Sequence, residues 1–350
     1  MTTWLWIGFI LFVIAMLALD LGVLNRKAHV IGIREALGWT AFWVTLALLF
    51  NVAVYFIYEH HWCGIGLESH HEKGGKQAAL VFITGYIIEE SLSLDNIFVI
   101  AVIFAYFGVP AIHQHRVLFW GIVGAQVMRG AMILAGTALI HRFDWIIYVF
   151  GGFLILTSIK MLRVQSESIH PDRNPLVRLA RKIYPVSRDF VGPKFFTRVD
   201  GKRAITPLFL VLLVVESTDL MFAVDSIPAI FAVTRDPFLV FTSNIFAILG
   251  LRSLYFALAG MMGKFRYLKY SLAIVLAFVG VKMLLSHSPF AIPTILSLGV
   301  IAGLIGAGVI GSLVFVKPDS MTANRLSERG VTPGPNAPCN SSATSSASRR

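Results

Sequence analysis

Two apolar segments of this sequence contain carboxylates at similar spacings. Residues 89–96 read EESLSLDN and residues 216–226 read ESTDLMFAVDS. A carboxylate inside a lipid bilayer is costly unless it is paired, protonated or bound to a cation. Acids that recur in two such segments therefore indicate a site or a path for cations.

Helical geometry places some of these side chains on one face. Glu89 and Asn96 are separated by two turns, and so are Asp219 and Ser226. Carboxylate, amide and hydroxyl oxygens are hard ligands, which suit Mn²⁺, Mg²⁺ or Ca²⁺ better than copper. The predicted ligands of the cation are Glu89, Asp95, Asn96, Asp219, Asp225 and Ser226.

Two of these acids, Asp95 and Asp225, point about 100° away from the shared faces. They would reach the same point if the helices unwind locally. Pro228 favours a kink beside Asp225, because it cannot donate a hydrogen bond to the carbonyl of Val224. The first segment has no proline at this place, so its break is less well supported.

Basic residues in neighbouring apolar segments are expected to balance the acids. Arg129 and Arg252 are predicted to face the interior and pair with them, whereas Lys160 and Lys282 lie nearer to segment ends and either reach inward or extend to the membrane surface. Six acids and two arginines leave a charge of −4, and both lysines would reduce it to −2, which one divalent cation would cancel. Glu90 and Glu216 are the less secure members of the acidic set, since each could lie toward a helix end.

Two other interpretations of the polar residues stay open. The acids could form a buried ion-pair network that only holds helices together. The loop at residues 59–76 contains four histidines, Cys63 and Glu72, which could bind a metal or form a flexible polar loop.

Composition identifies the class of protein. The chain has 350 residues, of which 56% are hydrophobic and 14% charged, whereas a soluble domain has about 25% charged residues. The net charge of +11 is concentrated in short loops, which indicates membrane topology rather than nucleic-acid binding. Signatures of phosphate-binding loops, nucleophile elbows and zinc proteases are absent from the sequence, so we expect neither an enzyme nor a permanently bound cofactor.

The expected fold is an all-α bundle in the lipid bilayer with about nine transmembrane helices. A helix needs about 20 apolar residues to cross the membrane. The candidate spans are 4–22, 37–58, 77–107, 117–140, 144–163, 205–234, 239–262, 266–285 and 292–316. The third and sixth are too long for one straight helix, so we expect them to be tilted or broken.

The loops predict the orientation. Positive charge is concentrated in loops 23–36, 164–204 and 263–270, whereas the alternate loops have few basic residues. The positive-inside rule then places the N-terminus outside and the C-terminus in the cytoplasm of a bacterial-type inner membrane.

Several pairs of matching positions indicate an internal repeat in the sequence. Asp95-Asn96-Ile97 corresponds to Asp225-Ser226-Ile227, and the distance from Phe143 to Lys160 equals that from Phe265 to Lys282. The predicted organisation is two three-helix repeats of opposite orientation, as in many secondary transporters. Its segments are two N-terminal helices and a His-rich loop at 1–76, the repeats at 77–163 and 205–285, a basic linker at 164–204, a last helix at 292–316 and a disordered tail at 317–350.

The chain resembles the TerC family of integral membrane proteins, which is named for tellurium resistance. The likeness rests on residues 19–26, 85–96 and 222–229, and it extends over roughly residues 5–316. It implies a role in metal-ion homeostasis, with manganese exporters and thylakoid insertion factors among the relatives, and it supports the six predicted ligands. Glu90 stands where the family often has lysine.

Two functions follow as expectations. The first is transport of a divalent cation, most of all Mn²⁺ export, with the lipid bilayer and the metal ion as the partners. Any tellurium resistance would be indirect, because carboxylates repel an oxyanion. The alternative is a non-transporting membrane scaffold or protein-insertion factor that recruits partners through loop 164–204.

Overall fold

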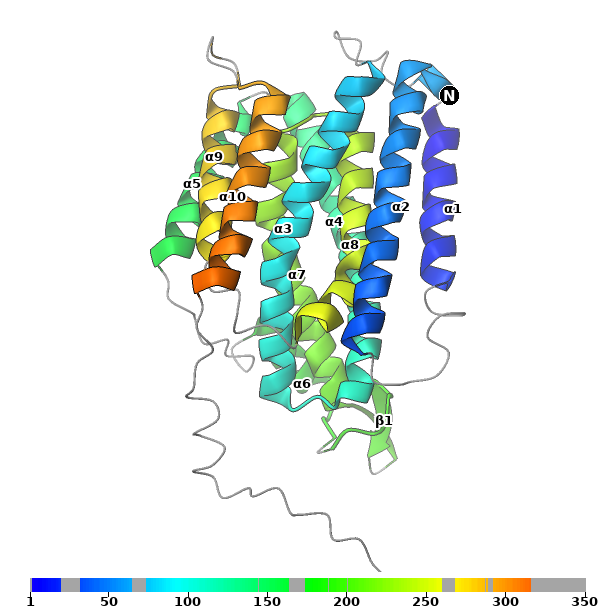
Figure 1. Cartoon of the computed structure of the whole chain (residues 1–350). Helices are drawn as coiled ribbons and strands as arrows, with labels where there is room; N and C mark the ends of the chain where they lie inside the picture. The colour runs from blue at the N-terminus through cyan, green and yellow to red at the C-terminus, as the bar shows by residue number, and fades with distance from the viewer. Residues whose placement is uncertain are drawn as a thin grey trace, which may run out of the picture.

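The computed structural model is a bundle of long helices with a small hairpin at one end (Figure 1). It describes residues 2–19, 32–64, 74–143, 145–163, 174–187, 189–199, 201–259, 268–286, 288 and 292–315. The long helices are α1 (Thr2–Leu19), α2 (Ile33–Glu59), α3 (Gly75–Phe107), α4 (Ala111–Arg142), α5 (Ile146–Arg163), α7 (Pro207–Phe231), α8 (Pro237–Ala259), α9 (Leu268–Leu284) and α10 (Thr294–Phe315). A short 3₁₀ helix, η2 (Trp62–Gly64), follows α2.

Six helices are long and apolar enough to cross a membrane, namely α2, α4, α5, α7, α8 and α10. α1 and α9 contain shorter apolar stretches, and α3 contains the acids. The all-α membrane character is therefore supported, whereas nine spans and two inverted repeats stay predictions. The predicted orientation of the termini also stays a prediction.

The ends of two helices show why the chain folds as it does. α3 ends at Gly108 in the left-handed conformation (φ +62°), and Val109 N–H donates to the carbonyl of Phe104 at 2.9 Å. This is a Schellman stop, for which glycine has no steric cost. α8 begins at Asp236, whose Oδ1 accepts from Phe238 N–H at 3.0 Å and whose Oδ2 accepts from the Tyr58 hydroxyl at 2.8 Å. The same carboxylate thus caps α8 and ties it to the end of α2.

The centre of the bundle is formed by α3, α4, α7 and α8. α3 packs against α8 and α7, and α4 packs against both α7 and α8. α8 is the most enclosed of the six candidate spans, with 89% of its apolar stretch buried, against 17% for the peripheral α10. Polar side chains on these four helices are therefore shielded from lipid.

A second close pair, α5 and α9, lies beside this centre (Figure 1). A Cβ on Gly280 would lie 2.9 Å from the carbonyl oxygen of Gly151, so the absence of side chains lets the two backbones touch. Ser158 then donates to the carbonyl of Ala273 at 2.7 Å across the interface. Small residues and interhelical hydrogen bonds are the usual means by which helices associate in lipid.

The expectation of a break in the two acidic helices is wrong. α3 is continuous over 33 residues and α7 over 25, with Pro228 inside it. The proline lies within the last turn of α7, where its missing hydrogen bond does not open the helix. α3 is roughly 50 Å long, more than the about 30 Å of a hydrocarbon core, and it leans across the bundle instead of unwinding (Figure 1).

The basic linker contains structure that the sequence did not predict. It forms the helix α6 (Pro175–Ile183) and an antiparallel hairpin of β1 (Phe196–Val199) and β2 (Lys202–Ile205). β2 occupies residues assigned to the predicted span 205–234, so α7 begins at Pro207. The side chain of Asn174 caps α6 and donates to Ser217 Oγ on α7 at 2.5 Å, which fixes the linker to the bundle. The predicted disordered tail, 317–350, lies outside the described residues.

Candidate functional site

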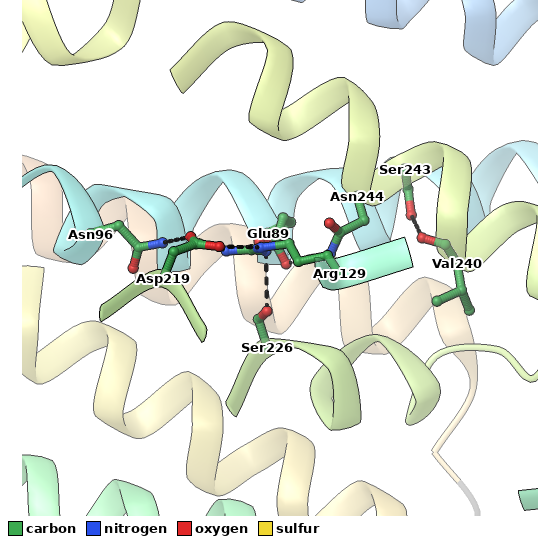
Figure 2. A network of polar contacts seen from close by, with 8 residues as sticks. All are labelled: Glu89, Asn96, Arg129, Asp219, Ser226, Val240, Ser243 and Asn244. Carbon is green, nitrogen blue, oxygen red and sulfur yellow. Dashed lines mark hydrogen bonds and ion pairs between the residues drawn. The ribbon is translucent and has the colours of Figure 1, made fainter. Parts of the chain in front are cut away.

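The centre of the bundle contains a buried ion-pair network around Arg129 of α4. Its guanidinium binds the carboxylate of Glu89 on α3 and, on α7, contacts Asp219 Oδ1 at 3.0 Å and Oδ2 at 3.3 Å. The same group donates to Ser226 Oγ at 3.3 Å (Figure 2). The side chains of Arg129 and Glu89 are each 1% exposed. When all three groups are ionised, this network carries one excess negative charge.

Two amides extend the network on either side. Asn96 Nδ2 donates to Asp219 Oδ1 at 3.4 Å, and Asn244 Nδ2 of α8 donates to Glu89 Oε2 at 3.0 Å (Figure 2). Both amide oxygens, as well as Ser93 Oγ, are buried and have no hydrogen-bond partner within the described residues. Buried oxygens without a donor are uncommon in folded proteins, and they are good ligands for a hard cation.

Asn244 was not among the ligands predicted from the sequence, although its position in the chain marked it as a candidate. It is an amide in a predominantly apolar span, and burying an amide in lipid has a free-energy cost for the same reason as burying an acid. Its partner could not be read from the chain, since Glu89 lies 155 residues away.

Gly85 explains how α8 comes close enough to provide Asn244. It lies one turn before Glu89 on α3, and a Cβ placed there would lie 2.8 Å from Ser243 Oγ and 3.3 Å from Ser243 Cβ. The close approach of the two helices at Gly85 and Ser243 therefore brings Asn244 to Glu89.

We expect Gly85→Ala to destabilise the protein by about 1–3 kcal/mol, because the new methyl group overpacks this contact. Thermal unfolding of the purified protein in detergent measures the effect. Adding Ser243→Ala removes the nearer atom and should restore part of the loss. Gly152→Ala is the control, since a Cβ there meets nothing within 4 Å. Equal stability of Gly85→Ala and Gly152→Ala would refute the packing argument.

The remaining two predicted ligands have other surroundings. Asp225 Oδ1 accepts from Thr157 Oγ1 of α5 at 3.1 Å, and Lys160 lies close enough to attract its charge. Asp95 has interaction partners of its own. Because α3 and α7 do not unwind, the rotation of about 100° per residue directs Asp95 and Asp225 away from the faces of Asn96 and Ser226.

The two less secure acids lie well inside their helices, so the suggestion that they sit toward helix ends is wrong. Glu90 Oε2 and Glu216 Oε2 are buried without a hydrogen-bond partner among the described residues. The Glu216 carboxylate lies against Gly124 of α4, where any Cβ would collide with it. Glu216 also interacts electrostatically with Asp219, which links it to the Arg129 network.

The second arginine lies beside a histidine, and the two lysines differ from each other in burial. Arg252 Nη1 lies 3.1 Å from His115 Nε2, a residue for which the sequence predicted no role. Lys282 is buried, and its Nζ has no hydrogen-bond partner within the described residues. Lys160 is exposed on the outside of the described bundle. Of the two positions expected for Lys282, inside the bundle or at the membrane surface, the structure shows the first.

The arrangement as it stands is a charge-neutralising clamp. In the described part of the chain, no three His, Cys, Asp or Glu side chains converge as a ready metal site. The guanidinium of Arg129 instead occupies the position between two carboxylates that a cation would take. Much of the His-rich loop, including His70, His71 and Glu72, lies outside the described residues, so its metal-binding interpretation stays a prediction.

Comparison with known proteins gives the family. The family described as integral membrane protein TerC family matches residues 74–320. An uncharacterized membrane protein of Myxococcus xanthus is 54% identical over 310 residues, which cover 89% of this chain and 92% of the relative. Alx of Escherichia coli (strain K12), named as a candidate membrane-bound redox modulator, is 47% identical over 87% of this chain and 92% of its own length. No solved structure matches significantly.

Proposed function

This chain belongs to the TerC family of integral membrane proteins, and on that basis we propose that it transports a hard divalent cation, with Mn²⁺ favoured, through the Arg129 network. Export is the direction that the family resemblance favours. Contributions to metal homeostasis and tellurium resistance would follow from that flux.

The observation that carries the proposal is the composition of the buried centre. Two carboxylates share one guanidinium, and two amide oxygens and a hydroxyl beside them have no partner among the described residues. Glu90 and Glu216 add two further buried carboxylates. A network that served only stability would be expected to balance its charges and hydrogen bonds, because each uncompensated group is costly in the membrane. Surplus oxygen ligands and surplus negative charge fit a site that accepts a cation.

Arg129 has a defined role in this mechanism. In the absence of metal its single positive charge offsets one of the two charges of Glu89 and Asp219, which lowers the cost of keeping the acids buried between turnovers. A divalent cation that enters the network competes with the guanidinium for the same oxygens. Glu89, Asp219, Asn96, Asn244 and Ser226 would then supply the hard oxygen ligands that Mn²⁺ accepts. If the metal displaces the guanidinium from the two carboxylates, the charge of the site changes from −1 with Arg129 to 0 with the divalent cation.

The names of several relatives suggest a second candidate, redox modulation at the membrane. The side chains that converge here are carboxylates, amides, hydroxyls and a guanidinium, which bind cations and do not exchange electrons themselves. We therefore place cation transport first.

The decisive experiment uses the purified full chain in liposomes that contain a dye quenched by Mn²⁺. We expect Mn²⁺ to enter these vesicles at least tenfold faster than protein-free vesicles, with Mg²⁺, Ca²⁺ and Zn²⁺ as competitors to establish selectivity. A pH gradient of either sign tests proton exchange as the driving force. Equal Mn²⁺ entry with and without protein, in both directions of the gradient, would refute transport.

A further inference from the structure

The β1–β2 hairpin lies at one end of the bundle (Figure 1). A basic hollow of about 610 Å³ is lined by residues of this hairpin and of the chain that precedes it. Three of its six lining residues are cationic, and within the described residues no carboxylate pairs with any of the three. The lining residues are Tyr184, Lys194, Phe196, Thr197, Arg198 and Arg203.

The hairpin register concentrates this charge. Arg198 lies directly opposite Arg203, and the next pair toward the turn joins Val199 to Lys202. Like charges directly opposite each other destabilise an antiparallel pair. A bound anion between the two guanidinium groups would turn this repulsion into attraction.

The hollow is built on anchored elements. Thr206, which precedes α7, donates from Oγ1 to the carbonyl of Lys194 at 2.8 Å and from its backbone N–H to that of Phe195 at 2.9 Å. The rings of Phe196 and Phe209 lie 4.9 Å apart. The cationic side chains therefore start from a backbone that is fixed to the bundle, which lowers the entropic cost of binding.

The neighbouring helix α6 indicates what kind of anion is available. Val177 is buried in the core, whereas Leu179 and Ile183 are 54% and 61% exposed beside the exposed basic residues Arg178 and Lys182. An amphipathic helix with apolar and basic side chains of this kind lies in the headgroup region of a membrane. Tyr184, the C-cap of α6, lines the hollow, so the hollow lies directly beside this helix.

We propose that this hollow binds the phosphate of an anionic phospholipid from the adjacent leaflet. Arg198 and Arg203 provide planar donor groups that match phosphate oxygens, and Lys194 adds a third positive charge. Apolar side chains on α6 offer the acyl chains a surface, which favours a lipid over free phosphate. The inference does not depend on transport, because it concerns the linker and not the Arg129 network.

The test is a calorimetric titration of the full-length protein, in neutral detergent and at constant physiological salt, with dioctanoyl phosphatidylglycerol. We expect saturable binding that Arg198→Gln with Arg203→Gln weakens roughly thirtyfold, as the loss of two interfacial cations implies. Arg178→Gln with Lys182→Gln removes the same charge from α6 and should weaken binding by less than about threefold. Lys194→Gln is a second variant of the hollow, in case the double arginine variant fails to fold.

Four results would overturn the proposal. Unchanged binding by the hollow variants would place the lipid elsewhere, and an equal loss in the α6 control would reduce the effect to general surface charge. Inorganic phosphate that displaces the lipid at equal concentration would show a free-anion site. Dioctanoyl phosphatidylcholine should bind at least tenfold more weakly, and equal binding would also contradict the assignment.

Discussion

Replacing Arg129 by glutamine should lower the free energy of unfolding by about 3–5 kcal/mol, the usual cost of leaving buried charges without their partner. The substitution removes the cation between Glu89 and Asp219 while keeping a polar, uncharged side chain. Thermal unfolding in detergent, followed by tryptophan fluorescence, measures the change. Arg142→Gln, at the exposed end of the same helix, should have almost no effect.

A triple variant separates stability from transport. Arg129→Gln together with Glu89→Gln and Asp219→Asn makes the network neutral, so we expect most of the lost stability to return. Mn²⁺ flux should remain absent, because the ligands are gone. An Arg129→Gln protein as stable as the unmodified chain would show that the acids do not need this arginine. Mn²⁺ flux in the triple variant would contradict the assignment of the cation to this network.

Removing the two clamped carboxylates should abolish Mn²⁺ flux in liposomes and also destabilise the protein. Glu89→Gln with Asp219→Asn leaves Arg129 as a buried cation with no carboxylate partner. Asp95→Asn with Asp225→Asn is the matched pair, since it changes one carboxylate on each of the same two helices. We expect this pair to lose flux as well, because both acids belong to the ligand set predicted from the sequence.

Stability distinguishes the two pairs. Asp225 accepts a hydrogen bond from Thr157, and the exposed Lys160 lies close enough to attract its charge, so we expect the second pair to unfold nearer to the temperature of the unmodified protein than the first pair. If Asp95→Asn with Asp225→Asn leaves Mn²⁺ flux intact, the ligand set predicted from the sequence is wrong in these two members. If Glu89→Gln with Asp219→Asn leaves it intact, the Arg129 network is not the transport site.

The cost of a charge in lipid made much of the site predictable. Glu89, Asp219 and Arg129 could be selected because an ionisable residue in an apolar span requires a partner wherever the helices pack. The shared helical face of Asp219 and Ser226 also followed from spacing alone, and both contact Arg129 in the structure. Asn96 lies on the expected face with Glu89 and reaches Asp219.

Predictions failed where they depended on how the chain packs and where its helices end. The break expected beside Asp225 is absent, because α7 continues through this residue to Phe231. Pro228 therefore lies in the last turn of the helix, where its missing hydrogen bond does not open it. The prediction for the linker failed for another reason. Its hairpin is stabilised by contacts with Thr206 and Phe209, which belong to a segment predicted to be transmembrane.

By itself, the sequence determined that this is a helical membrane protein with carboxylates that must be compensated inside it, because hydropathy and charge are local properties of the chain. The tertiary structure decided how they are compensated. It brought Glu89, Arg129 and Asp219 together from three helices, added Asn244 from a fourth, and placed Asp225 beside Thr157 of α5 instead. These contacts depend on which faces of the helices pack together. Glycines such as Gly85 determine how closely two helices approach each other.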